Sequence, residues 1–306
     1  MLSILVAAAT AAAVPMTAPG PQGPLAGTFL DAGANAPVVL IIPGSGPTDR
    51  DGNNPAGITA APYRLLAEAL AAKGVSTVRI DKRGLGGSKG AVADGNKVTI
   101  ADYATDTHNW VGAIRHKTGQ RCVWLLGHSE GSLIALAAAQ QPEGICGVIS
   151  VSGAGRKLSD VIRDQLRSNP ANAPLLDPAM KALDSLERGQ HVDVADMHPA
   201  LQRLFAPQVQ DFLIDMFRHD PAKLAAALKV PLLIVQGEHD LQVSTVDAKM
   251  LAAAQPKAKL VLVPTMNHEL KDVATDDRAA NFATYGDPSL PVDSTLVDAI
   301  AAFVRR

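Results

Sequence analysis

The chain has 306 residues, of which 47% are hydrophobic and 19% are charged, and its formal net charge is −2. This composition is typical of a globular protein and gives room for one large domain with an insertion. Without a basic tract, the chain is a poor candidate for binding nucleic acid. Beyond the N-terminal segment no apolar run could span a bilayer, so we expect no stable membrane insertion of the mature chain.

Residues 1–23 differ from the rest, because an Ala-rich apolar stretch from Leu2 to Val14 gives way to Pro and Gly. The stretch resembles the apolar part of a secretory signal with small residues near a cleavage point, although it has no basic residues at its start. We therefore expect a periplasmic or secreted protein whose mature chain begins between Pro15 and Pro24. The alternative is a cytoplasmic protein that keeps the segment as an apolar helix or a tail.

Short β-branched runs then alternate with helix-forming segments. In chain order, we predict a strand at 36–46, a helix at 62–74, a strand at 75–84, a helix at 99–119, a strand at 122–127, a helix at 130–141, a strand at 144–155, a strand at 230–240, a helix at 247–255, a strand at 258–268 and a helix at 294–306. Strands of this type are buried on both faces. The alternation predicts an α/β fold with a mostly parallel sheet and helices on both faces.

Residues 156–229 interrupt this alternation and lack strand patterns. Apolar residues recur there at helical spacing, at Val209, Phe212, Leu213, Met216 and Phe217. We predict a helical cap inserted between two parts of the core, residues 24–155 and 230–306. Most of the apolar side chains should pack onto the core, and some should line a pocket for an apolar part of a substrate.

The sequence GHSEG (127–131) lies between a predicted strand and a predicted helix, and it matches the pattern G-x-S-x-G. In this context the pattern is typical of a sharp turn that exposes the serine hydroxyl at the edge of a sheet. We predict that Ser129 is a nucleophile and that the backbone N–H of Glu130, at the helix N-terminus, stabilises an oxyanion. A purely structural turn is the alternative.

A serine nucleophile needs a base, and in folds with this turn the acid and the histidine follow the serine in chain order. Asp240 and His268 each follow a predicted strand. We therefore predict a triad of Ser129, Asp240 and His268, with His268 as general base and then general acid and Asp240 orienting its ring. Glu238 is the best alternative acid, and His239 should point to the opposite side of the extended segment.

Other polar residues have simpler explanations. His128 should point away from the neighbouring serine, and Asp247 looks like an ordinary helix N-cap. Solvated or capping roles are expected for the remaining histidines, His108, His116, His191, His198 and His219.

The second oxyanion donor should come from the loop at 43–53, after the first buried strand. The N–H of Ser45 is the first choice and that of Gly46 the second. The charged run at 49–51 should form ion pairs that fix the loop, the alternative being a clamp for a charged substrate.

Cys122 and Cys146 fall on neighbouring predicted strands, and their spacing is not that of a metal site. We favour two small buried thiols. A disulfide is the alternative if the protein is exported.

Together these motifs resemble the α/β-hydrolase superfamily, from about Gly23 to the end of the chain. The landmarks are GHSEG, DKRGLGGS (81–88), GEHD (237–240) and MNHEL (266–270). GSGPTDRDGN (44–53) and YGDPSLP (285–291) are similar to a narrower group, the bacterial EstD-type serine carboxylesterases, also labelled serine aminopeptidase-like or dienelactone hydrolase-like. Pro43 departs from this pattern, since many relatives have His there.

The resemblance implies hydrolysis of small-molecule esters with short to medium acyl chains, without a cofactor or metal. A peptidase or amidase with the same triad is the alternative, and a non-catalytic binding protein is a third reading. The oligomeric state is not predicted.

Overall fold

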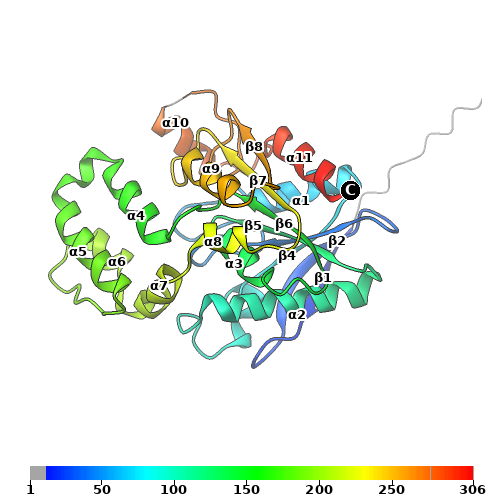
Figure 1. Cartoon of the computed structure of the whole chain (residues 1–306), viewed down its shortest axis with the longest axis horizontal. Helices are drawn as coiled ribbons and strands as arrows, with labels where there is room; N and C mark the ends of the chain where they lie inside the picture. Colours follow the sequence, from blue (N-terminus) through cyan, green and yellow to red (C-terminus); the bar gives the residue numbers. More distant parts are fainter. Residues whose placement is uncertain (1–11, 276, 306) are drawn as a thin grey trace, which may run out of the picture.

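The computed structural model describes residues 12–275 and 277–305, and a central eight-stranded sheet organises them (Figure 1). The strand order is β1-β2-β4-β3-β5-β6-β7-β8. β2 pairs antiparallel with both of its neighbours, β1 and β4, and the other neighbours pair in parallel. The strands are β1 (Ala13–Ala18), β2 (Leu25–Leu30), β3 (Val38–Ile42), β4 (Ser76–Ile80), β5 (Val123–His128), β6 (Ile145–Val151), β7 (Leu232–Gly237) and β8 (Lys259–Val263).

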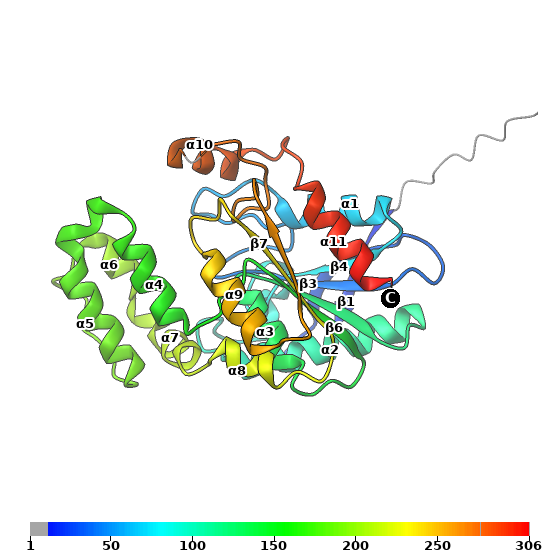
Figure 2. The same cartoon turned by 45° about the horizontal axis from the view of Figure 1, so that its top comes forward.

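Helices cover both faces of the sheet (Figure 2). One face carries α1 (Pro62–Ala72) and α11 (Ser294–Val304). The other carries α2 (Ile100–Thr118), α3 (Glu130–Ala138), α8 (Pro221–Ala226) and α9 (Thr245–Ala254). Shorter elements are η1 (Gly86–Ala91), α10 (Arg278–Ala283) and η4 (Thr284–Gly286). The α/β fold with helices on both faces of a mostly parallel sheet is confirmed.

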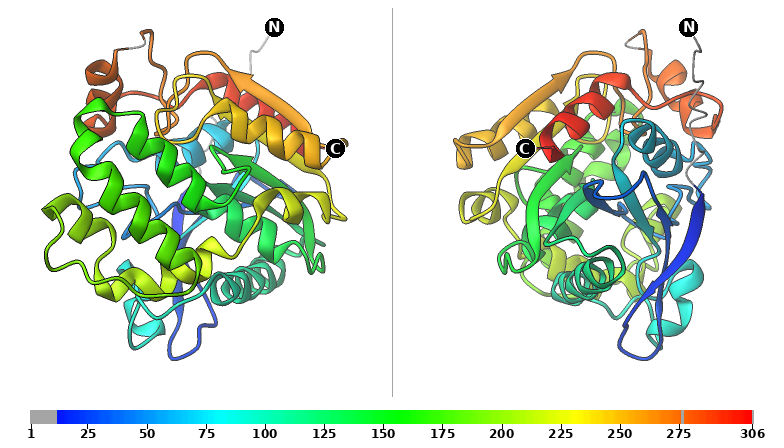
Figure 3. Two further views of the ribbon diagram at one scale, coloured as in Figure 1. Left: turned by 60° about the vertical axis from the view of Figure 1, so that its left-hand side comes forward. Right: turned by 90° about the vertical axis from the view of Figure 1, so that its right-hand side faces the viewer.

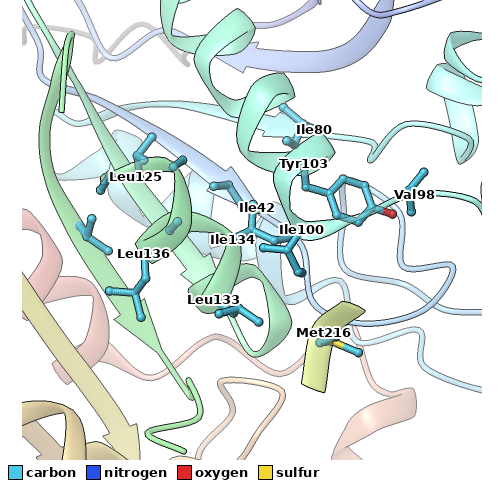
Figure 4. Packing of buried hydrophobic residues seen from close by; sticks show 14 of the residues in the cluster. Ile42, Ile80, Val98, Ile100, Tyr103, Leu125, Leu133, Ile134, Leu136 and Met216 are labelled. Atoms are coloured by element: carbon cyan, nitrogen blue, oxygen red, sulfur yellow. The ribbon is translucent and has the colours of Figure 1, made fainter. Parts of the chain in front are cut away.

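Local sequence signals explain where the core elements begin and end. All five residues of β3 are buried, as expected of a central parallel strand covered on both sides. Thr99 and Asp102 form a capping box at the start of α2, and Gly119, with φ 72°, ends that helix. Figure 4 shows part of the resulting core, in which Ile42 and Leu125 of the sheet pack with Ile134 of α3.

A helical insertion stands to one side of the sheet (Figures 1 and 3). It contains α4 (Leu158–Arg167), η2 (Pro170–Leu175), α5 (Leu176–Glu187), α6 (Pro199–Leu204), η3 (Pro207–Val209) and α7 (Gln210–Phe217). Asp215 anchors it to the core by accepting a 2.8 Å hydrogen bond from the N–H of Ile100. The predicted end at residue 229 is too late, because α8 packs on α3 and α9 of the core.

The N-terminal part of the sheet corrects the predicted start of the core. β1 pairs along its whole length with β2, from Ala13 opposite Leu30 to Ala18 opposite Leu25. The core therefore begins before residue 24, and a mature chain starting between Pro15 and Pro24 would lose part or all of this strand. Residues 1–11 of the predicted signal lie outside the described part of the chain.

Cys122 and Cys146 form a disulfide with a Cα–Cα distance of 5.1 Å, so the prediction of two separate thiols is wrong. Cys122 directly precedes β5 and Cys146 lies in the adjacent β6. The register between these strands shifts at Val123 and Trp124, next to the bridge.

No helix within the described ranges has the length and apolar character needed to cross a membrane.

Candidate active site

Ser129 occupies a strained turn between β5 and α3. Its φ of 54° and ψ of −119° lie in a region that residues other than glycine rarely adopt. A Cβ atom on Gly127 would lie 2.0 Å from the carbonyl oxygen of Gly131, and one on Gly131 would lie 2.2 Å from that of Ile42. Only glycine fits at both positions, which explains why the serine is flanked by Gly at each second residue.

Asp240 and His268, predicted from separate strand ends, are joined by hydrogen bonds. Nδ1 of His268 lies 2.9 and 3.0 Å from the two carboxylate oxygens of Asp240. The same carboxylate accepts from the N–H groups of Gln242 (2.8 Å) and Val243 (2.9 Å) and from Nε2 of Gln236 (3.0 Å). These donors fix the acid, and the acid fixes the ring so that Nδ1 carries the proton and Nε2 is left to accept one.

The electrostatics of this pair follow from burial and from mutual attraction. Burial alone would lower the pKa of His268, but the charge and hydrogen bond of Asp240 outweigh it and raise that pKa above its ordinary value. Burial alone would raise the pKa of Asp240, but His268 and the two backbone donors outweigh it and lower that pKa. Asp240 therefore stays ionised, and His268 loses its proton at a higher pH than a free imidazole does.

One cavity of about 590 Å³ is lined by every predicted site residue except Asp240. Ser129, His268, Ser45, Gly46 and Glu130 all line it. The insertion contributes a largely apolar part of the wall, formed by Leu158, Val161, Ile162, Phe212, Leu213 and Met216.

The loop after β3 approaches the serine closely. A Cβ atom on Gly44 would lie 3.3 Å from Cβ of Ser129, so the next N–H, that of Ser45, comes from a segment beside the hydroxyl. No hydrogen bond to a described residue takes up the N–H of Ser45. Glu130 is the first residue of α3, whose N–H has no partner within the helix. Both predicted donors thus lie at the cavity, and neither N–H is bonded to a residue in the described part of the chain.

Ion pairs hold this loop, as predicted for the charged run at 49–51. Arg50 pairs with Asp81, and Asp51 pairs with Arg79. Asp49 accepts hydrogen bonds from the N–H groups of residues 51 and 53 at 2.8 and 2.9 Å.

A buried chain of hydrogen bonds, which the sequence did not reveal, connects the loop to the histidine. The N–H of Gly44 donates to the hydroxyl oxygen of Tyr63 (3.0 Å), and this hydroxyl donates to Nδ1 of His128 (2.8 Å). Nε2 of His128 donates to the carbonyl oxygen of His268 (2.9 Å). Burial, followed by the charge of His268, lowers the pKa of His128 to about 3, so its ring stays neutral. His128, predicted to point away from Ser129, bonds to these partners and also lines the cavity.

A second buried contact crosses the site from the other side. Nζ of Lys82 lies 2.8 Å from the carbonyl oxygen of Gly44 and 2.8 Å from Oε1 of Glu130. It therefore connects the loop after β3 with the residue after Ser129. Sequence reasoning did not single out Lys82, because a single lysine after a strand has no distinctive pattern.

The alternative residues do not enter the site. Glu238 is exposed and His239 does not line the cavity. Asp247 lies in the first turn of α9 rather than at its N-cap, which is Ser244, and it pairs with Arg156. In the insertion, His191 pairs with Asp211, His198 caps α6 and His219 lies near Asp215. Within the described ranges, no group of His, Cys, Asp or Glu side chains has the arrangement of a metal site.

The family described as serine aminopeptidase, S33, matches residues 57–272, which include the serine turn and the Asp240–His268 pair. The chain belongs to this serine aminopeptidase S33 family. Among curated relatives, esterase EstD of Thermotoga maritima is 24% identical over 279 residues, covering 88% of this chain and 62% of EstD. The chain thus spans less than two thirds of the length of that relative.

Solved structures of esterases share the fold of this S33 family member. Esterase Pf2001 of Pyrococcus furiosus superposes with a TM-score of 0.58 at 15% identity, over 97% of this chain and 93% of that chain. A thermophilic esterase from Thermogutta terrifontis has a TM-score of 0.57 at 19% identity, over 96% of this chain and 98% of that chain. At these identities the likeness establishes the α/β-hydrolase fold.

Proposed function

We propose that the protein is a serine hydrolase that cleaves small carboxylic esters with short to medium acyl chains. The observation that carries this proposal is the strained Ser129 turn, which shares one cavity with His268, the histidine that is hydrogen-bonded to Asp240. Membership of the S33 family and the similarity to EstD support it. A cavity of about 590 Å³ also falls within the range typical of small-molecule sites.

In the proposed reaction, Nε2 of His268 takes the proton of the Ser129 hydroxyl as its oxygen attacks the ester carbonyl. The N–H groups of Glu130 and Ser45 would hold the negative charge that forms on the carbonyl oxygen. The intermediate collapses by losing the alcohol, which takes the proton from His268 and leaves an acyl group on Ser129. Water, deprotonated by His268, then attacks the acyl group and releases the acid and free enzyme. Asp240 stabilises the imidazolium form in both steps.

The test is hydrolysis of p-nitrophenyl esters from acetate to palmitate by the wild type and by Ser129→Ala. We expect activity that peaks at short to medium chains and is lost in the variant. Ser132→Ala is the matched control, because this buried serine of α3 bonds to Ser150 (2.6 Å) and does not line the cavity. Full activity in Ser129→Ala would overturn the proposal.

A peptidase or amidase using the same residues is the second candidate, favoured by the description of the S33 family. Aminoacyl-naphthylamides tested beside the esters separate the two. Faster turnover of the amides than of every ester would favour the peptidase.

We also propose that the protein is periplasmic or secreted. The disulfide between Cys122 and Cys146 supports this, because such bridges persist mainly in oxidising compartments. Fractionation of cells that express the full chain tests the proposal, and recovery only in the cytoplasm with both thiols reduced would contradict it.

A further inference from the structure

Glu269 is a carboxylate at the candidate active site that has no hydrogen-bond or ion-pair partner among the residues that the structure describes. It follows His268 in the chain, is 5% exposed and lines the same cavity as Ser129. Charges act on it only through space, and its side chain forms no hydrogen bond or ion pair with a described residue. Glu130 lines the same cavity and is also 5% exposed, but it is paired with Lys82. A carboxylate in the cavity wall with no partner among the described residues is open to a donor that enters the cavity.

The charges nearest to Glu269 have other partners. Burial is the largest influence and raises the pKa of Glu269, while His268 and Lys271 lower this pKa and Asp240 raises it. His268 is hydrogen-bonded to Asp240. Nζ of Lys271 donates to the carbonyl oxygen of Leu290. Neither positive group therefore pairs directly with Glu269.

The other basic side chains that line the described cavity do not pair with Glu269 either. Lys82 donates to Gly44 and Glu130. Arg203 is exposed on the insertion. His128 is neutral and hydrogen-bonded on both ring nitrogens. The Glu269 carboxylate is thus a hydrogen-bond acceptor in the cavity, and none of these side chains donates to it.

We propose that Glu269 accepts a hydrogen bond from a donor group of the substrate, a hydroxyl or an ammonium next to the ester bond. The inference rests on the proposed function, since it specifies which esters the same site takes. Hydrogen bonds to a carboxylate are roughly twice as strong as neutral ones, and exclusion of water strengthens them further. Glu269 lines the same cavity as Ser129, and the charge of His268 acts on it, so a donor bound to Glu269 would lie in the cavity where the ester reacts. Esters of hydroxy and amino acids carry such a donor, and their apolar parts would meet the apolar wall that the insertion contributes.

The test compares three phenyl esters of nearly equal shape, those of lactic acid, alanine and isobutyric acid. They carry a hydroxyl, an ammonium or a methyl group on the same carbon. For the wild type we expect kcat/KM on at least one donor-bearing ester to exceed that on the isobutyrate by about tenfold or more, as for a hydrogen bond to a charged group.

Two variants show which donor is bound. Glu269→Met removes the acceptor, so the preference over isobutyrate is lost for either donor. Glu269→Gln removes the charge but keeps an acceptor, so a preference for the ammonium is lost and one for the hydroxyl is partly kept. Glu238→Gln, at an exposed carboxylate outside the cavity, is the matched control and should keep the wild-type ratios.

Equal hydrolysis of the three esters by the wild type would overturn this inference and leave the esterase proposal standing. An equal loss of kcat/KM on all three esters in Glu269→Met would also overturn this inference, because that loss indicates a structural role. A folded wild type that cleaves no ester would overturn the proposed function and this inference with it.

Discussion

Tyr63→Phe should weaken both folding and catalysis, because one hydroxyl group serves two parts of the site. The hydroxyl accepts from the N–H of Gly44 at 3.0 Å and donates to His128 at 2.8 Å, and Tyr63 is 2% exposed. Burial, together with the nearby Glu269 charge, raises the pKa of this hydroxyl, so it remains a donor at every working pH. Phenylalanine keeps the ring and leaves two buried polar groups unpaired.

Each buried group left without a partner costs about 1–3 kcal/mol, so the free energy of unfolding should fall by about 2–6 kcal/mol. That is a large part of the roughly 5–15 kcal/mol that stabilises a typical domain. Gly44 precedes Ser45, the proposed oxyanion donor, and His128 holds the backbone of His268. A small displacement of these groups can cost about 100-fold in rate, so kcat should fall by about 10- to 100-fold with a smaller change in KM.

Urea denaturation followed by circular dichroism measures the first effect, and steady-state kinetics on a short-chain ester measures the second. Tyr285→Phe is the matched control, since its hydroxyl takes part in a single long contact, 3.4 Å from Nε2 of Gln242. Tyr285→Phe should lower the free energy of unfolding by about 1 kcal/mol or less. A Tyr63→Phe protein with wild-type stability and wild-type kcat would refute the role of this hydrogen-bond chain.

Two further predictions concern the Asp240–His268 pair and the disulfide. Because Asp240 outweighs burial and raises the pKa of His268, the acidic limb of the kcat/KM profile should lie above pH 6.5, where the free imidazole titrates. Asp240→Asn should shift that limb to lower pH and lower kcat on the order of 10³- to 10⁴-fold, and an unchanged limb would contradict the assignment. The bridge between Cys122 and Cys146 closes a loop with a sequence separation of 24, so its reduction should lower the free energy of unfolding by about 3 kcal/mol. Thiol counting in unreduced, denatured protein checks the bridge, and two free thiols would contradict it.

Much of the fold could be predicted because its strands are short, continuous and buried on both faces. β3 and β7 stand out in the sequence for this reason, and the helices between strands carry ordinary start and stop signals such as Pro62 and Gly119. The residues of the Asp240–His268 pair could be predicted as well, since parallel strands end at one edge of the sheet.

Other features depend on contacts that sequence periodicity does not encode. β1 lies at the point where the Ala-rich apolar run gives way to Pro and Gly, and it contains Pro15, so it became visible only through its pairing with β2. The disulfide depends on the register of β5 and β6, which shifts beside it. His128 lies next to the predicted nucleophile, but its partners, Tyr63 of α1 and the backbone of His268, are distant in sequence. Glu269 lies next to the predicted base, and its surroundings likewise depend on the tertiary structure.

The central claim, that Ser129 is an activated nucleophile, is tested most directly by reaction with a fluorophosphonate probe and intact-protein mass spectrometry. We predict one adduct per chain in the folded protein, mapped to Ser129 after digestion and absent from Ser129→Ala. Ser132→Ala should be labelled as fully as the wild type. A folded wild type that forms no adduct, or an adduct that persists in Ser129→Ala, would contradict the account.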